Sequence, residues 1–214
     1  MFESERREMV AKLVSSGYIK SQKVRNAMET IPRHVFVPEE MQRYAHADTP
    51  LNIGEGQTIS APHMVAMMLE ILDFEKGMTV LEIGCGSGYH ASLAAYIVGA
   101  AGHVFTIDIV ENLTVKARSN IANVGLHDRI DVIHADGSAG LPKHAPFDRI
   151  MAACSAPEVP QPLVEQLADP GIAVIPVGTG YSQSLAIIRK KNGRVTREEI
   201  SGVAFVPMRG EYGR

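Results

Sequence analysis

The sequence predicts an α/β fold with a doubly wound, mostly parallel sheet. Residues 61–180 alternate between short apolar runs typical of buried strands and longer segments with helical periodicity. Such alternation is typical of βαβ units, in which helices cover a parallel sheet. An Asn-Gly pair at 192–193 separates two further strand-like runs and predicts a C-terminal antiparallel hairpin. With 214 residues, the chain fits one domain with extensions.

The first 60 residues predict an N-terminal helical extension that runs into an irregular loop. Ser21 is expected to cap a helix with apolar residues at helical spacing, and Pro32 to end it. Residues 49–60 contain one proline, two glycines and no clear period, and the length of this loop suggests a functional role. We therefore divide the chain into an extension with a functional loop at 1–60 and a main domain at 61–214, which together form one structural unit.

The main domain is expected to begin with a helix, because Ser60 is a candidate N-cap and Pro62 suits the first helical turn. Beyond it, strand and helix patterns alternate along the chain. The expected strands are 78–83, 103–108, 130–136, 147–154 and 171–178, the expected helices are 89–99, 110–124 and one around 160–168, and the closing hairpin joins 184–191 to 194–200.

Composition narrows the class of function. Hydrophobic residues make up 45% and charged residues 21% of the chain, and no apolar run approaches the ~18 residues of a membrane span. The acidic start, MFESERREMV, does not resemble a secretory signal, so we expect a cytoplasmic protein without a membrane partner, and a monomer. The net charge of −3 and the lack of a basic stripe argue against nucleic acid. Cys85 and Cys154 are isolated, so no metal site is expected.

The strongest motif is the run VLEIGCGSG at 80–88, in which a buried strand leads into a glycine-rich turn and then a helix. Gly84, Gly86 and Gly88 allow a ligand to approach the backbone, and the helix start offers free N–H groups. A dinucleotide fingerprint would need glycine where Tyr89 stands, and a phosphate-binding loop would need Gly-Lys-Ser/Thr. The motif therefore indicates a nucleotide-like ligand without a diphosphate contact.

Acidic residues close the neighbouring strands. Asp108 follows Gly88 by 20 positions and can accept hydrogen bonds from both hydroxyls of a ribose. Asp136, followed by Gly137, closes the third strand and can accept from an adenine amine; both aspartates could instead only cap the elements that follow. Glu82 lies inside an apolar strand, where it is expected to order the glycine turn, to bind a cofactor amine, or to serve a purely structural role.

Ribose and adenine contacts without a diphosphate site suggest S-adenosylmethionine, whose cationic sulfonium suits an acidic pocket. With these features the chain resembles the protein-L-isoaspartate (D-aspartate) O-methyltransferase family, within the class of seven-stranded, Rossmann-like methyltransferases. The resemblance covers nearly the whole chain. Besides the glycine turn, it rests on GQTISAPHM at 56–64, SAPEVP at 155–160 and FVPMRG at 205–210.

The resemblance implies roles for particular residues. The segment 61–214 would be the domain that binds S-adenosylmethionine. Thr58, Ser60 and His63 would stand at the substrate carboxylate, with Ser60 as the catalytic residue. Two positions depart from the family pattern. Cys85 stands where threonine or serine is familiar, and His90 stands where an amide residue is common. The residues that would line the cofactor site are Glu82, Gly84, Gly86, Gly88, Asp108, Asp136 and Gly137.

The family activity is methyl transfer from S-adenosylmethionine to the free carboxylate of L-isoaspartyl residues in damaged proteins and peptides, which initiates repair and leaves S-adenosylhomocysteine. A carboxylate has a pKa of about 4 and needs no general base at neutral pH. Neutral donors such as the Ser60 hydroxyl leave it more nucleophilic than an arginine would, and no Lys or Arg occurs between positions 44 and 75. The alternatives are a methyltransferase for another substrate, a module that binds S-adenosylmethionine without turnover, and, disfavoured by Tyr89, a nicotinamide oxidoreductase.

Overall fold

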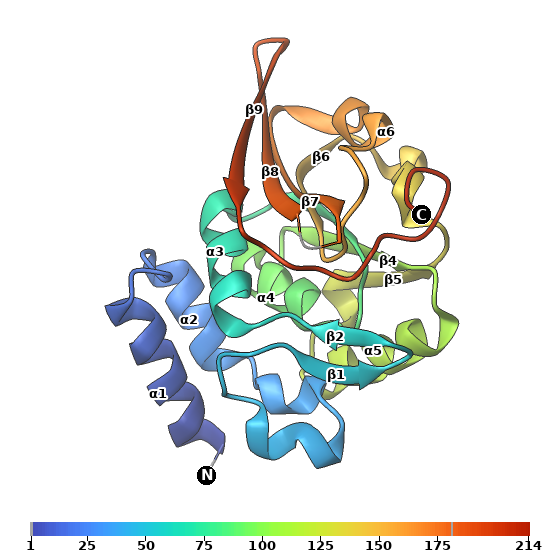
Figure 1. Ribbon diagram of the computed structural model, residues 1–214. Helices are drawn as coiled ribbons and strands as arrows, with labels where there is room; N and C mark the ends of the chain where they lie inside the picture. The colour runs from blue at the N-terminus through green and yellow to red at the C-terminus, as the bar shows by residue number, and fades with distance from the viewer. Residues whose placement is uncertain (1, 181) are drawn as a thin grey trace.

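The computed structural model describes residues 2–180 and 182–214, and its central feature is a seven-stranded sheet in the order β5-β4-β3-β6-β7-β8-β9 (Figure 1). Strands β3 to β7 pair in parallel, whereas β8 pairs antiparallel with both β7 and β9. The predicted fold class and C-terminal hairpin are confirmed. The strands are β3 (Thr79–Ile83), β4 (His103–Asp108), β5 (Ile130–His134), β6 (Phe147–Ala152), β7 (Leu167–Thr179), β8 (Ser182–Lys191) and β9 (Arg194–Ser201).

Both faces of the sheet are buried at the central strands β3, β4 and β6, which explains their continuous apolar runs, whereas β9 is exposed along its whole length. Val80 and Leu81 are neighbours in β3, yet they belong to two different hydrophobic clusters, because successive side chains of a strand point to opposite faces. Each face therefore has its own core, as a doubly wound sheet requires. The helices of the main domain are α3 (Pro62–Leu72), α4 (Tyr89–Val98), α5 (Glu111–Asn123) and α6 (Gln161–Glu165), with short 3-10 turns η3 (His127–Arg129), η4 (Gly137–Ala139) and η5 (Pro142–His144).

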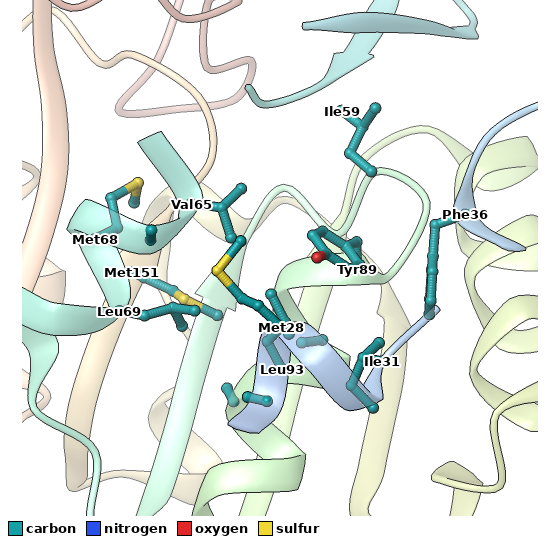
Figure 2. Packing of buried hydrophobic residues seen from close by; sticks show 14 of the residues in the cluster. Met28, Ile31, Phe36, Ile59, Val65, Met68, Leu69, Tyr89, Leu93 and Met151 are labelled. Atoms are coloured by element: carbon teal, nitrogen blue, oxygen red, sulfur yellow. The ribbon is translucent and has the colours of Figure 1, made fainter. Parts of the chain in front are cut away.

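The N-terminal extension packs into one of these cores. It consists of α1 (Phe2–Ser15), α2 (Gln22–Thr30), η1 (Arg33–Phe36) and η2 (Glu39–Tyr44). Ser21 caps α2 as predicted, accepting a hydrogen bond from the Val24 amide at 3.3 Å. Figure 2 shows Met28 and Ile31 of this region lying against Leu93 of α4. A continuous hydrophobic cluster thus joins residues before and after position 60.

The segment expected to be an irregular loop is a two-stranded antiparallel hairpin, so that prediction was wrong. β1 (Leu51–Gly54) pairs with β2 (Gln57–Ile59), and Leu51 lies opposite Ile59. The turn uses Glu55 and Gly56, both with positive φ. Leu51 and Ile59 are buried, which anchors the hairpin to the core and makes such short strands stable.

Ser60 is not the N-cap of α3, which corrects a second prediction. The cap position belongs to Ala61, because Pro62 is the first helical residue and the residue before a proline is held in an extended conformation. Ala61 offers no side-chain cap; instead, the carboxylate of Asp48 accepts a 2.9 Å hydrogen bond from the His63 amide. The hydroxyl of Ser60 is therefore not needed to begin the helix. Across the described ranges, no helix combines the length and apolar character needed to cross a membrane.

Candidate active site

A cleft lies at the carboxyl end of β3, where the sheet order reverses between β4 on one side and β6 on the other. Open α/β sheets bind their ligands at such a switch point. The cleft has an empty volume of about 800 Å³, part of which is open to solvent. Four segments form most of its lining: 57–60, 82–87, 107–110 and 206–209.

The glycine turn forms one wall of the cleft. Gly84 and Gly86 line the cleft, and both have positive φ, a conformation that a side chain would strain. Gly88 does not line it; a Cβ there would lie 3.0 Å from a side-chain carbon of Ile121, so this glycine allows α4 and α5 to approach. The turn thus exposes backbone to a ligand at two of its three glycines.

Asp108, at the end of β4, lines the cleft beside this turn. One carboxylate oxygen accepts from the Gly86 amide and the other from the Val110 amide, each at 3.0 Å. Each oxygen retains capacity for a second donor, because a carboxylate oxygen has two lone-pair sites. Asp108 can therefore order the glycine turn and accept from hydroxyl groups of a ligand at once.

Glu82 is fully buried in β3 and lines the floor of the cleft. Its Oε2 accepts a 2.5 Å hydrogen bond from the Thr106 hydroxyl, while Oε1 has no hydrogen-bond partner among the described residues. The nearest basic group is Nδ1 of His90, 3.8 Å from Oε1, and Nε2 of His90 also lacks a partner within the described part of the chain. Two buried polar atoms are thus left for a ligand to satisfy.

Burial keeps both of these groups uncharged at neutral pH. Loss of hydration raises the pKa of Glu82 to about 8, the negative Asp108 adds to this, and the Thr106 hydroxyl opposes it. Burial lowers the pKa of His90 to about 4, and the nearby Arg33 acts in the same direction. The floor of the cleft is therefore neutral until a cationic ligand favours ionisation of Glu82.

We expect the unliganded protein to lose stability between pH 6.5 and 8. From about pH 4.5 to 8 the folded chain keeps the Glu82 proton that the unfolded chain releases, so rising pH favours unfolding. His90 has the opposite effect on stability between about pH 4 and 6.5, because the unfolded chain binds a proton there that the folded chain does not bind. Above pH 6.5 only the effect of Glu82 remains, and it lowers the free energy of unfolding by about 2 kcal/mol over 1.5 pH units.

Urea unfolding of the parent and of Glu82→Gln at pH 6.5 and pH 8 measures this loss. The parent should lose about 2 kcal/mol more than the variant, whose amide does not titrate in this range. Equal losses in the two proteins would show that Glu82 is ionised in the unliganded fold.

Asp136 and Gly137 occupy different positions relative to the cleft. Gly137 lines it, whereas Asp136 does not. The Asp136 carboxylate accepts from the Ser138 amide and from the Glu211 amide, both at 2.8 Å. It thus caps η4 and holds the C-terminal segment, which is the capping alternative considered for it. Both oxygens keep some acceptor capacity.

Thr58 of β2 and Ser60, which follows β2, also line the cleft. Thr58 is exposed and Ser60 is half-buried. His63 does not line the cleft: its Nδ1 lies 2.9 Å from the Asp48 carboxylate, and its ring lies 5.3 Å from that of Tyr18. The predicted substrate residues are therefore brought together only in part.

The C-terminal segment completes the cleft. The Ser155 amide donates to the Val206 carbonyl at 2.8 Å, and the Met208 amide donates to the Ser155 carbonyl at 2.9 Å. These bonds tie the SAPEVP segment to the FVPMRG segment, and residues 206–209 face the cleft. In Figure 1 the C-terminal chain passes in front of the carboxyl ends of the sheet strands. The FVPMRG segment thus lines the same cleft as the glycine turn, and the SAPEVP segment binds it from behind through Ser155.

Sequence reasoning missed two cationic residues near this site. Arg209 lines the cleft and is exposed. The FVPMRG motif was the available signal, but it was not assigned a role. Arg33 is fully buried and donates to the carbonyl of Ser60 at 2.8 Å. No local pattern marks an arginine after Pro32 as buried.

Two cysteines also line the cleft, Cys85 in the glycine turn and Cys154 after β6. Burial raises the pKa of both thiols, and the carboxylates of Asp108 and Glu82 raise it further. Both therefore remain protonated at neutral pH, and a protonated thiol is a poor nucleophile. Cys85 thus does not compete with an acceptor for an electrophilic ligand.

The arrangement fits a nucleoside that carries a cationic amino-acid tail. The exposed glycine backbone suits close approach, Asp108 has free acceptor capacity, and the unpartnered Oε1 of Glu82 can accept from an ammonium group. Among the described residues, no group of three or more His, Cys, Asp or Glu side chains could hold a metal ion.

Comparison with known proteins identifies the family of the chain. The sequence profile of the protein-L-isoaspartate(D-aspartate) O-methyltransferase family matches residues 4–213. A protein-L-isoaspartate O-methyltransferase of Methanococcoides burtonii is 50% identical over 206 residues, covering 96% of this chain and 100% of that protein. The enzyme of the same name from Hyperthermus butylicus is 46% identical over 220 residues, covering 99% of this chain and 91% of that protein.

A solved structure gives the same result in three dimensions. A protein-L-isoaspartate O-methyltransferase of Plasmodium falciparum, in complex with S-adenosylhomocysteine, matches with a TM-score of 0.86 at 29% identity and covers 95% of this chain and 98% of that one. Profile, relatives and fold all extend over nearly the full length of the sequence. The chain therefore belongs to the protein-L-isoaspartate (D-aspartate) O-methyltransferase family.

Proposed function

We propose that the chain transfers the methyl group of S-adenosylmethionine to the free carboxylate of L-isoaspartyl residues in damaged proteins and peptides, and so initiates their repair. The observation that carries this proposal is a single cleft lined by two chemically different groups of residues. The glycine turn and Asp108 form one group, the cofactor wall, and the hydroxyl residues Thr58 and Ser60 form the other, the acceptor wall. A donor and an acceptor can thus be held in the same cleft.

The cofactor wall would bind through the residues that the family resemblance suggests. Asp108 accepts from the ribose hydroxyls, the backbone of Gly84 and Gly86 lies against the ligand, and Glu82 accepts from its amino group. Gly88 and Asp136 act from outside the cleft, by allowing helix packing and by holding η4 and the C-terminal segment. When bound, S-adenosylmethionine supplies an electrophilic methyl group, and S-adenosylhomocysteine remains as the product.

The residues of the acceptor wall need only orient the acceptor carboxylate, and they do not have to remove a proton from it. An isoaspartyl carboxylate is already ionised at neutral pH. The Ser60 hydroxyl donates to one carboxylate oxygen and leaves the other free to attack the methyl group. A neutral donor binds the anion without withdrawing much of its negative charge, and it holds the other oxygen in the orientation that attack on the methyl group requires.

His63 has an indirect part in this proposal. Its amide and Nδ1 both contact the same oxygen of Asp48, at 2.9 Å each. These contacts fix the first turn of α3, which begins two residues after Ser60. We therefore assign His63 to the support of the acceptor wall, at its rim, and Thr58 and Ser60 to direct contact.

The proposed acceptor is a peptide or an unfolded protein segment, and nucleic acid is not part of the proposal. The formal net charge of −3 opposes binding to a phosphate backbone. We also propose that the protein acts as a monomer in the cytoplasm, where damaged proteins accumulate. Light scattering at micromolar concentration tests the monomer: a mass near 23.2 kDa is expected, and twice that value would contradict it.

The function is tested with methyl-labelled S-adenosylmethionine and a pair of peptides that differ only in one aspartyl linkage. We expect labelling of the L-isoaspartyl peptide and none of its normal aspartyl counterpart. The label should be lost on mild alkaline treatment, as expected for a methyl ester. Equal labelling of both peptides would contradict the proposed acceptor, and cofactor binding without any labelling would indicate a binding module.

A further inference from the structure

Arg33 is the one residue of the N-terminal extension whose side chain reaches the carbonyl of Ser60, among the contacts of the described residues. It lies at the start of η1 and is fully buried. Its Nη2 donates to the Ser60 carbonyl at 2.8 Å, and its Nε donates to the Ala45 carbonyl at 2.9 Å. One planar side chain thus holds two backbone segments at a fixed separation.

The same guanidinium contacts the cofactor wall. Its Cζ lies 5.1 Å from the ring centre of Tyr89, the first residue of α4, directly after the glycine turn. Phe36, at the other end of η1, packs on the same ring with a centroid distance of 5.4 Å, and both aromatic residues appear in Figure 2. The short η1 segment is therefore in contact with the cofactor wall through Tyr89 and with Ser60 through Arg33.

A buried cation is a costly way to fill this space. In the part of the chain that the structure describes, Arg33 is in salt-bridge contact with no carboxylate, although Asp48 and the Tyr89 side chain favour its charged form, and its Nη1 has no hydrogen-bond partner there. Burial lowers the pKa of Arg33 to about 10, which leaves it cationic at neutral pH. Carbonyl groups and an aromatic face offset only part of the lost hydration, and an apolar side chain of similar size would avoid that loss. Stability alone therefore does not account for an arginine here.

An apolar residue at position 33 could not form a rigid link between Ser60 and the glycine turn. Arginine presents its donors in a fixed fork and stacks on aromatic rings, which a lysine ammonium does not reproduce. Ser60 lies between the end of β2 and Pro62, outside any helix or strand of the described chain. Its carbonyl is held by Arg33, and the orientation of its peptide unit depends on that bond.

We propose that Arg33 is a positioning residue for methyl transfer: it fixes Ser60 relative to the glycine turn by binding the Ser60 carbonyl while stacking on Tyr89. This inference rests on the proposed function, because it needs Ser60 to orient the acceptor. It predicts that loss of the guanidinium group lowers kcat without lowering the affinity for the cofactor, since Arg33 does not line the cleft.

The test compares Arg33→Lys with Arg149→Lys. Arg149 is a matched control: it is also buried, and its guanidinium donates to the carbonyls of Leu72, Asp73 and Asp148, away from the cleft. Both variants should lose thermal stability to a similar degree. Well below the midpoint of unfolding, kcat for an isoaspartyl peptide should fall at least about tenfold in Arg33→Lys and stay within about twofold of the parent in Arg149→Lys. The affinity for S-adenosylhomocysteine should stay within about twofold in both.

A double-mutant cycle shows whether Arg33 acts through Ser60. If it does, Arg33→Lys should add little to the kcat loss of Ser60→Ala, whereas two independent effects would multiply. Arg33→Gln, which is neutral and keeps an N–H donor, replaces the lysine variant if a buried ammonium prevents folding, with the same kcat loss expected.

Equal kcat losses in the Arg33 and Arg149 variants, multiplicative effects in the cycle, or an unchanged kcat would overturn the inference while leaving the proposed function intact. Failure of the unaltered protein to methylate the isoaspartyl peptide would overturn both, and it is seen before any variant is compared.

Discussion

Asp108→Ala should weaken the binding of S-adenosylhomocysteine by about 100-fold or more. The carboxylate has two proposed tasks, accepting from the ribose hydroxyls and holding the amides of Gly86 and Val110 at 3.0 Å. A hydrogen bond to a charged group contributes about 1.5–3 kcal/mol, so loss of two ribose bonds costs about 3 kcal/mol or more. Each 1.4 kcal/mol is a factor of ten in affinity. The freed amides also loosen the turn, which adds to the loss.

Calorimetric titration of the parent and of three variants measures this effect. Asp108→Asn keeps the shape but only one acceptor oxygen, so an intermediate loss of about tenfold is expected. Asp131→Ala is the matched control, because Asp131 is an exposed carboxylate on the neighbouring strand β5 whose ion pair among the described residues is with Nε2 of His103, at 3.2 Å. It should bind like the parent. An Asp108→Ala protein that is folded and binds within threefold of the parent would contradict the assignment of Asp108 to the ribose.

The strands and the glycine turn could be predicted from the sequence because their causes are local. Burial on both faces leaves almost no polar residue inside a parallel strand, so β4 appears in the sequence as the apolar run 103–108 that ends at Asp108. The turn after β3 needs positive φ at Gly84 and Gly86, and glycine supplies it. Features fixed by neighbours in sequence were therefore read correctly.

The hairpin at 51–59 and the start of α3 were misread for a common reason. Leu51 and Ile53 alternate with polar residues, which is a strand signal, but a run of four residues is too short to stand out beside a proline and two glycines. Ser60 has the chemistry of an N-cap, yet Pro62 shifts the cap to Ala61, and Asp48 supplies the carboxylate from a distant segment. Packing against the core overrode the local preference in both places.

Parts of the candidate site depend on contacts between distant segments, which no local pattern carries. Arg33 reaches Ser60 across 27 positions, and the Glu211 amide reaches Asp136 across 75. The sequence identified Asp136 as a residue at a strand end but could not show that the C-terminal segment binds its carboxylate. His63 was likewise placed near Ser60 by sequence, whereas Asp48 and Tyr18 draw its ring away from the cleft.

Ser60→Ala should lower kcat for an isoaspartyl peptide by about 100-fold while the affinity for S-adenosylhomocysteine stays within about threefold. A misplacement of a reacting group by about 1 Å costs about two orders of magnitude in rate, and an ionised acceptor without an orienting partner samples many unproductive positions. The cofactor contacts proposed here lie on the other wall, so cofactor affinity should change little. Single-turnover rates with saturating cofactor separate this loss from product release.

Ser60→Ala can lower kcat without destabilising the fold, because the Ser60 hydroxyl does not cap α3. Loss of an N-cap serine costs about 1 kcal/mol, but here the cap position is Ala61, so Ser60→Ala should change the free energy of unfolding by less than about 0.5 kcal/mol. Ser184→Ala, which removes an exposed hydroxyl bound to Glu199 on β9, is a matched control and should leave kcat unchanged. If Ser60→Ala lost cofactor affinity in proportion to kcat, the hydroxyl would support the shape of the cleft, and orientation of the acceptor would have to come from Thr58 or Arg209, which face the same space.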